Sequence, residues 1–147
     1  MGNFILIVDD DEVDQFMLER TLRGIGVLNP IRKLSDGNTA IRYLNGDPPY
    51  HDRTAYPFPS VLFLDLKMPG VSGWDVLDWV HALAIKRDAK LFVHSPVTAI
   101  PELTKLYALG ADSFISKPLQ EIDLFNLIYH FPGPWEIQGP APDKDQG

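Results

Sequence analysis

The chain has 147 residues, of which 45% are hydrophobic and 22% are charged, and its formal net charge is −7. This length suits one domain with a sizeable core and is too short for a second folded domain. The composition argues against a largely disordered chain. The negative charge, without any basic cluster, predicts no direct nucleic-acid binding. The chain contains no cysteine, which excludes disulfides and thiolate metal sites and fits a cytoplasmic protein. The apolar start at residues 4–8 is too short for a signal peptide, so no membrane association is expected.

Apolar runs of strand length alternate along the chain with segments of helical periodicity. The expected strands are residues 4–8, 31–34, 61–64, 91–94 and 113–116. The runs at 4–8 and 61–64 show no polar alternation, which is typical of central strands covered by helices on both faces. This order predicts an α/β fold with a doubly wound parallel sheet.

The segments between the strands repeat apolar residues three and four positions apart, as helices with one buried face do. The expected buried faces are Val13, Phe16 and Met17; Ala40, Ile41 and Leu44; Leu77, Val80 and Ala84; Leu103 and Tyr107; and Leu124, Leu127, Ile128 and Phe131. Gly46 and Gly110 follow such segments, where a residue in the left-handed conformation often ends a helix. We therefore expect five helices.

Two proline-rich stretches fall outside this pattern. Residues 46–60 are expected to form an extended surface connection, with a partner-docking loop as the alternative. Residues 132–147 contain four prolines and no apolar periodicity. We therefore divide the chain into a domain of residues 1–131 and a Pro-rich, partly disordered C-terminal tail of residues 132–147, in which Trp135 and Ile137 have the apolar surface to pack back.

Ionisable and hydroxyl side chains stand at the ends of the expected strands. Asp9 and Asp10 end the first strand, Asp65 ends the third, Ser95 follows the fourth and Lys117 follows the fifth. Ligands of parallel sheets bind beyond these carboxyl ends. Clustered carboxylates repel one another by about 4 kcal/mol per close pair at an effective dielectric near 20, so the site needs a cation. Carboxylates without His or Cys favour Mg²⁺.

Three motifs together carry a family resemblance. They are Ile-Leu-Ile-Val-Asp-Asp-Asp at 5–11, Leu-Asp-Leu-Lys-Met-Pro-Gly at 64–70 with Ser-Gly at 72–73, and Lys-Pro-Leu at 117–119. In this order and spacing the chain resembles the receiver domains of two-component response regulators over residues 4–131, in particular free-standing receivers of the chemotaxis and phytochrome types. The resemblance implies a flavodoxin-like, five-stranded sheet with strand order 2-1-3-4-5 and helices on both faces.

The resemblance also implies the roles of individual acids. Asp65 would be the phosphoacceptor. Asp10, Asp65 and the backbone carbonyl of Lys67 would bind Mg²⁺, and Asp9 would reach the metal through water. Outside this set, Asp11 and Asp14 open the first helix, where we expect them to cap the helix or to face solvent.

A second group of residues would respond to phosphorylation. By the same resemblance, Lys117 pairs with the phosphoryl oxygens, Ser95 supplies the switch hydroxyl, and Phe114 is the aromatic residue that swings when that hydroxyl moves. The peptide between Lys117 and Pro118 is expected to be cis, a form that is cheap only before proline.

A receiver would act through other proteins. The expected partners are a sensor histidine kinase or phosphotransfer protein as donor and a downstream protein target; a homodimer through the fourth and fifth helices stays open. Beyond its own phosphorylation and slow dephosphorylation the chain is not expected to be an enzyme.

One residue departs from the family pattern. Pro96 follows the switch hydroxyl and lacks the N–H that would donate to the phosphoryl group, a bond worth about 1.5–3 kcal/mol. A pseudo-receiver, a binding module with weak or no phosphorylation, is therefore the alternative. A phosphatase with an aspartyl nucleophile would fit the spacing of Asp9 and Asp11, but the turn at 67–70 behind Asp65 belongs to receivers.

Overall fold

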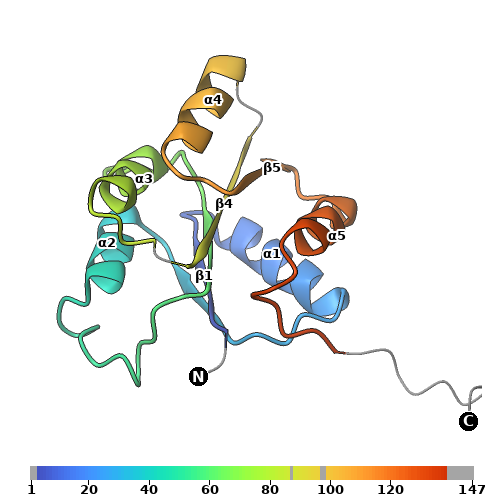
Figure 1. Cartoon of the computed structure of the whole chain (residues 1–147), viewed down its shortest axis with the longest axis horizontal. Coiled ribbons are helices and arrows are strands. Elements are labelled where there is room, and N and C mark those ends of the chain that lie inside the picture. The colour runs from blue at the N-terminus through green and yellow to red at the C-terminus, as the bar shows by residue number, and fades with distance from the viewer. Residues whose placement is uncertain (1–2, 87, 97–98, 139–147) are drawn as a thin grey trace, which may run out of the picture.

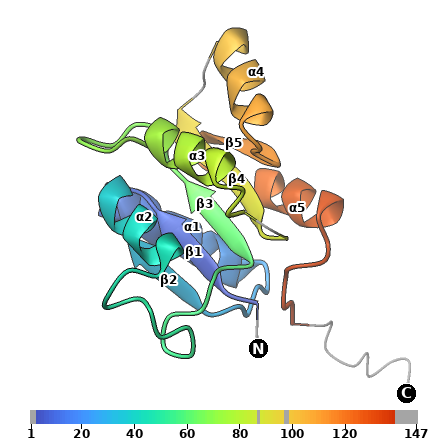
Figure 2. The ribbon, with the colours of Figure 1, turned by 60° about the vertical axis from the view of Figure 1, so that its left-hand side comes forward.

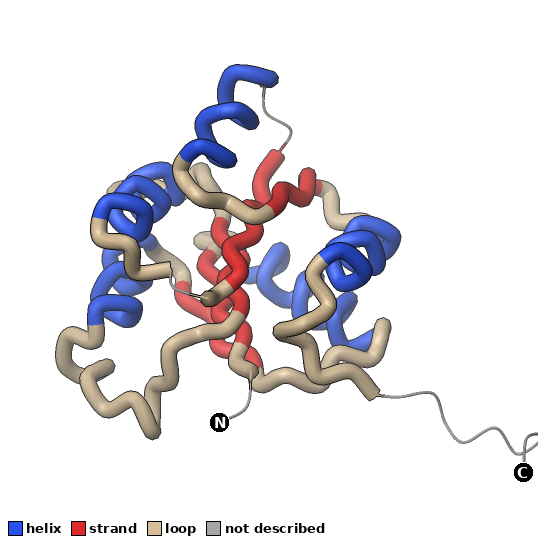
Figure 3. Tube along the Cα trace, viewed as in Figure 1, coloured by secondary structure: helices blue, strands red, loops and turns tan. Residues whose placement is uncertain are grey.

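The computed structural model describes residues 3–86, 88–96 and 99–138. Within these ranges the strands are β1 (Ile5–Val8), β2 (Ile31–Leu34), β3 (Val61–Leu64), β4 (Lys90–Pro96) and β5 (Ser113–Lys117). They form one parallel sheet in the order β2-β1-β3-β4-β5, which crosses the middle of the molecule in Figure 3. The predicted doubly wound sheet and its strand order are confirmed.

Helices cover both faces of this sheet. They are α1 (Glu12–Gly24), α2 (Gly37–Asn45), α3 (Gly73–Ala82), α4 (Ile100–Ala108) and α5 (Glu121–His130). α1 and α5 lie on one side of the strands and α2 and α3 on the other, while α4 stands at the top of both ribbon views (Figure 1, Figure 2). In the described part of the chain, no helix combines the length and the apolar character needed to cross a membrane.

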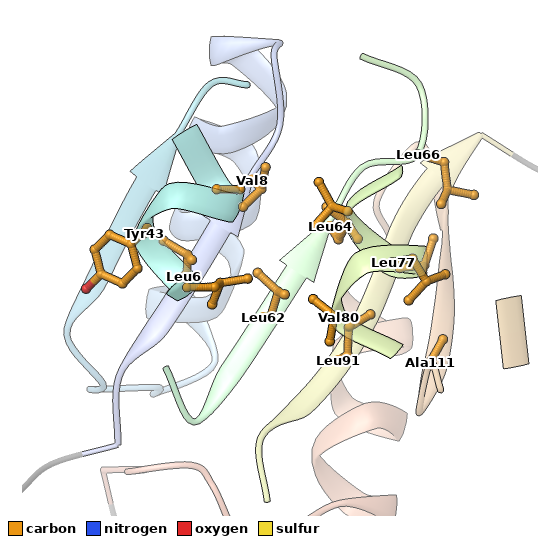
Figure 4. Close-up of a cluster of buried hydrophobic side chains, with 14 of the residues drawn as sticks. Leu6, Val8, Tyr43, Leu62, Leu64, Leu66, Leu77, Val80, Leu91 and Ala111 are labelled. Carbon is orange, nitrogen blue, oxygen red and sulfur yellow. The ribbon is translucent and has the colours of Figure 1, made fainter. Parts of the chain in front are cut away.

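The strands supply side chains to two hydrophobic clusters, one on each face. Leu6, Val8, Leu62 and Leu64 join the cluster under α2 and α3, which Figure 4 shows in close-up. Their sequence neighbours Ile5, Ile7, Val61 and Phe63 join the cluster under α1 and α5. β1 and β3 are therefore buried on both faces, as their unbroken apolar sequences predict.

The predicted buried face of α1 is wrong. Val13, Phe16 and Met17 are 67%, 55% and 43% exposed. The buried residues of α1 are instead Gln15, Leu18 and Leu22. Gln15 is buried because its side-chain amide donates to the backbone carbonyls of Asp9 and Leu34, at 2.6 and 3.0 Å. A prediction that counts only apolar residues assigns Gln15 to the surface, and it therefore selects the face of α1 that is opposite to the buried one.

Two further helix residues differ from expectation. Ala84 lies beyond the end of α3 and has a positive φ of 51°. Tyr107 of α4 is 49% exposed, and Leu106 is the buried residue of that helix. In the other helices the predicted faces are confirmed, since Leu77, Val80, Ala40, Leu44, Leu124 and Leu127 are buried.

The connection between α2 and β3 is folded against the domain rather than extended. The Pro48–Pro49 peptide is cis, and the rings of Tyr50 and Tyr56 lie 5.1 and 6.1 Å from the ring of Tyr43. Arg53 donates to the backbone carbonyls of α2 and of the connection itself. Aromatic rings and one arginine thus hold this surface connection in place; whether it also docks a partner stays a prediction.

Residues 132–138 pack back onto the domain. Trp135 is 7% exposed, and its indole N–H donates to the Phe131 carbonyl at 2.7 Å. The Asn29 side chain bonds to the carbonyl of Pro134 and to the N–H of Glu136. The expected disorder further along the tail concerns residues 139–147, which lie outside the described residues.

Candidate functional site

Carboxylates from two neighbouring strands meet at the carboxyl end of the sheet. β1 pairs with β3 so that Val8 lies opposite Leu64, and Asp9 and Asp65 directly follow these residues. Together with Asp10 they offer ligand oxygens that all lie within 4.8 Å of one another. Asp9 and Asp65 are buried, whereas Asp10 is exposed. The predicted convergence of these acids is therefore present in the structure.

Lys117, the last residue of β5, extends its ammonium group into this cluster. Its Nζ lies 2.8 Å from Asp9 Oδ2, 2.7 Å from Asp14 Oδ2 and 3.5 Å from Asp65 Oδ2. Burial alone would lower the pKa of Lys117, but the hydrogen bonds to Asp14 and Asp9 outweigh burial and hold that pKa above its usual range. The lysine is therefore a fixed positive charge.

The two acids at the start of α1 have different roles. Asp11 is the N-cap, and its side chain accepts from the backbone N–H groups of Val13 and Asp14. This use of the carboxylate as a cap is as predicted, and it argues against Asp11 as the second acid of a phosphatase. Asp14, also expected to be a capping or solvated residue, instead pairs with Lys117. The one sequence signal for that contact was the position of Asp14 in the first turn of the helix that follows β1, which places it toward the strand ends.

Local backbone bonds orient the two buried carboxylates. The N–H of Asp11 donates to Asp9 Oδ1 at 3.0 Å, and the N–H of Lys67 donates to Asp65 Oδ1 at 3.3 Å. Burial raises the pKa of Asp9 to about 6, although the hydrogen bond from Lys117 acts in the opposite direction. Gln15, which the sequence analysis missed, holds the backbone on which Asp9 stands.

α3 begins directly against the backbone of Asp65. The N–H of Gly73 donates to the Leu66 carbonyl at 2.9 Å, and a Cβ at Gly73 would overlap the Asp65 carbonyl oxygen. Ser72 and Asp75 form a capping box at this helix start. The Ser-Gly motif therefore has a steric reason, because only glycine allows the helix to approach the site so closely.

The predicted switch residues lie on β4 and β5. Ser95 is fully buried, and among the described residues its Oγ has no hydrogen-bond partner. Phe114 is partly buried against the cluster that contains Leu106 of α4. Ser95 was expected to follow β4, but the strand continues through Pro96, which is paired in register with Lys117. β3 pairs with β4 only as far as Val93, so no β3 residue needs the missing N–H of Pro96.

His94 is buried beside this region but does not belong to the carboxylate cluster. Its Nε2 has no hydrogen-bond partner among the described residues. Burial, together with the nearby charge of Lys117, lowers the pKa of His94 to about 4. The imidazole is therefore neutral at physiological pH and adds no second positive charge to the pocket.

The donor set fits a hard divalent cation. Asp9, Asp10 and Asp65 supply carboxylate oxygens only, and Lys117 is their one cationic contact among the described residues. Oxygen ligands of this kind suit Mg²⁺ and related ions. The expected backbone carbonyl ligand from Lys67 stays a prediction, as does the water-mediated role of Asp9. The Lys117–Pro118 peptide is cis, as predicted.

Fold and site together define a flavodoxin-like α/β protein with an acidic cluster, suited to a cation, at the switch point of its sheet. The chain belongs to the response regulator receiver domain family, whose model matches residues 5–129. It is 27% identical over 131 residues to the probable methanogenesis regulatory protein FilR2 of Methanothrix harundinacea, covering 89% of this chain and 82% of that protein. It is 28% identical over 128 residues to the two-component response regulator ARR17 of Arabidopsis thaliana, covering 86% of this chain and 82% of ARR17.

Solved structures of bacteriophytochrome response regulators are also similar. AtBRR superposes with a TM-score of 0.80 at 28% identity, covering 95% of this chain and 99% of AtBRR. RtBRR superposes with a TM-score of 0.81 at 26% identity, covering 99% of this chain and 88% of RtBRR. A further relative is the two-component response regulator ARR7 of Arabidopsis thaliana, which is 26% identical to this chain over 121 residues. The match covers 82% of this chain and 58% of ARR7. The predicted family is therefore confirmed.

Proposed function

We propose that this receiver is a phosphorylation switch that accepts a phosphoryl group on Asp65. The observation that carries the proposal is the meeting of three carboxylates, Lys117 and the buried Ser95 hydroxyl, which has no hydrogen-bond partner in the described part of the chain, at the strand ends. A buried hydroxyl without a partner costs about 1–3 kcal/mol, so the fold tolerates a group that becomes useful only when an acceptor arrives. A phosphoryl group on Asp65 would be such an acceptor.

In the proposed reaction an Asp65 carboxylate oxygen attacks the phosphorus atom of a donor phosphohistidine. The new P–O bond forms as the P–N bond breaks, and the electron pair of the P–N bond stays on the departing ring nitrogen. With a proton already on its other ring nitrogen, the histidine leaves as neutral imidazole. Asp9, Asp10, Asp65 and the Lys67 carbonyl would hold Mg²⁺, which neutralises phosphoryl oxygens when bound. Lys117 supplies a fixed positive charge, so no general base is needed. The chemistry of this chain would be limited to its own phosphorylation and to slow hydrolysis of the phosphorylated Asp65 by water.

The proposed partners are a donor protein and a downstream target. The donor is a sensor histidine kinase or a phosphotransfer protein. AtBRR and RtBRR are described as bacteriophytochrome response regulators, so a kinase of that type is the first donor to test. When the phosphoryl group draws in Ser95, Phe114 and the neighbouring α4 would shift, and the target would distinguish the two states of this surface.

Intact mass after incubation with a small phosphodonor and Mg²⁺ tests the proposal. The native chain and the control Asp78→Asn, which changes an exposed aspartate of α3, should each gain one phosphoryl group. Asp65→Asn should gain none. Asp10→Ala, which keeps the acceptor but removes a metal ligand, should need more Mg²⁺. Phosphorylation that persists in Asp65→Asn would overturn the assignment.

A pseudo-receiver is the second candidate, and Pro96 is the observation that favours it. A pseudo-receiver would bind its partner equally well with and without the phosphodonor, and its mass would not change. The cluster of Asp9, Asp10 and Asp65 argues for the switch, because an idle pocket has no need to gather like charges.

A further inference from the structure

Asp14 lies outside the carboxylate cluster, yet it makes the shortest of the three ion pairs of Lys117. The Nζ atom is 2.7 Å from Asp14 Oδ2, compared with 2.8 Å for Asp9 and 3.5 Å for Asp65. Hydrogen bonds run from the ammonium to Asp14 and to Asp9. An ammonium has three N–H donors, so two of them are occupied by these acids while Asp65 is unmodified.

The position of Asp14 is fixed by its neighbours. Asp11 caps α1 just before it, and the buried side chain of Gln15, the next residue, is bonded to the carbonyls of Asp9 and Leu34. α1 is thereby attached to the ends of β1 and β2. The Asp14 side chain is 35% exposed, so its charge is only partly screened by solvent.

We propose that Asp14 is a positioning residue that competes with the phosphoryl group for Lys117 and thereby sets the balance between phosphoryl and metal affinity. The proposal rests on the proposed function of Asp65. A phosphoryl group brings roughly −1.5 to −2 charges into the pocket, and the Asp14 carboxylate both repels it and holds a donor that it needs. For a divalent cation the effect has the opposite sign, because the negative charge of Asp14 offsets part of the positive charge that Lys117 places beside Asp9 and Asp65.

The test compares Asp14→Asn with the native chain in two titrations by calorimetry. Asn has the shape of Asp and keeps one acceptor oxygen, so the change removes the charge. Beryllofluoride affinity, measured at saturating Mg²⁺ as a probe of the phosphorylated state, should rise roughly tenfold. Mg²⁺ affinity measured without beryllofluoride should fall by about the same factor or less. Opposite signs are the diagnostic result, since structural damage would weaken both.

Two matched variants complete the test. Glu12→Gln removes a negative charge from the first turn of the same helix, at a residue without a contact to Lys117, and should leave both affinities near the native values. Asp14→Glu restores the charge and should move both affinities back toward the native values.

Each other outcome has a definite meaning. If the native chain binds beryllofluoride and Asp14→Asn changes neither affinity, or lowers both, the role of Asp14 is overturned while the proposed function stands. An effect of Glu12→Gln as large as that of Asp14→Asn would also overturn it, because net charge alone would then explain the result. If neither protein binds beryllofluoride, the proposed function is wrong and this inference with it.

Discussion

Among the described residues, Lys117 contacts three carboxylates at the end of the sheet, those of Asp9, Asp14 and Asp65. Asp10 joins Asp9 and Asp65 in the acidic cluster that could hold a metal ion. Without the lysine, each close pair of carboxylates would repel by about 4 kcal/mol at an effective dielectric near 20. The negative excess that remains is what a divalent cation would neutralise. Single substitutions at these residues should therefore act mainly by changing the balance of negative and positive charge at the site.

Pro96 lacks the backbone N–H that the expected chemistry uses as a hydrogen-bond donor to the phosphoryl group. Pro96→Ala restores an N–H next to the buried Ser95, and a bond from it to the phosphoryl group would be worth about 1.5–3 kcal/mol. Replacing proline also frees the unphosphorylated chain, which costs about 0.4–1 kcal/mol. The donor effect is larger, so we expect a larger phosphorylated fraction at fixed phosphodonor and a higher beryllofluoride affinity at matched Mg²⁺.

The control for Pro96→Ala is Pro101→Ala at the start of α4, which changes chain flexibility nearby without adding a donor at the pocket. It should leave the phosphorylated fraction near the native value. Equal beryllofluoride affinities in native protein and Pro96→Ala would mean that another donor already serves the phosphoryl group, and the view of Pro96 as a weakening residue would be wrong.

At the scale of elements, α1 has two functional sides. Its buried side carries Gln15, Leu18 and Leu22 and attaches the helix to the sheet. Its other side exposes Phe16 and its neighbours Val13 and Met17, in the first half of a helix whose N-cap, Asp11, follows Asp10. Under the proposed function a donor protein would bring a phosphohistidine to Asp65, and we predict that this exposed apolar side of α1 contacts the donor.

Phe16→Ala tests that surface. Phe16 is 55% exposed, so its truncation should change the free energy of unfolding by about 0.5 kcal/mol or less. Loss of one central apolar contact should slow phosphotransfer from a histidine kinase about tenfold. Phosphorylation by a small phosphodonor should be unchanged, because that donor needs no docking surface.

Leu83→Ala is the matched control, since Leu83 is equally exposed, at 55%, but follows α3 on the opposite face of the sheet. Kinase-dependent phosphotransfer should be unaffected by it. Equal rates in Phe16→Ala and the native chain would exclude this side of α1 as the docking surface.

At the scale of the whole molecule, the segment after α5 contributes to the packed core. The Trp135 ring lies 6.0 Å from Phe92 and 6.3 Å from Phe63, and it joins the cluster under α1 and α5. Ile137 bridges to Val27 in the connection between α1 and β2. These contacts attach the C-terminal end of the described chain to β3, β4 and the connection between α1 and β2.

Trp135→Ala should therefore destabilise the domain. Loss of a buried tryptophan typically costs about 3–5 kcal/mol, and urea unfolding would measure the change. Ile137 lies in the same segment but is 45% exposed, so Ile137→Ala should lower the free energy of unfolding much less. If Trp135→Ala unfolds at the native urea concentration, residues 132–138 are a dispensable tail and the domain ends near residue 131.

The sequence by itself determined the sheet and the carboxyl ends of β1 and β3, although not the end of β4. The unbroken apolar runs that became β1 and β3, and the acids that follow them, are local signals, because a parallel sheet brings the carboxyl ends of its strands to one edge whatever the details of packing. The convergence of Asp9, Asp10 and Asp65 could therefore be predicted from the order of the elements alone.

Only the tertiary structure decided which side chains meet across that edge. The contact between Asp14 and Lys117 joins residues 103 positions apart. The position of Asp14 in the first turn of α1 indicates that it lies near the strand ends, but not which residue it pairs with. The rotation of α1 depends on the buried hydrogen bonds of Gln15, which an apolar pattern assigns to the surface. Trp135 likewise finds its aromatic partners on strands far earlier in the chain. Periodicity reports how much of a segment is buried, whereas the partner of a polar group depends on three-dimensional geometry that periodicity does not contain.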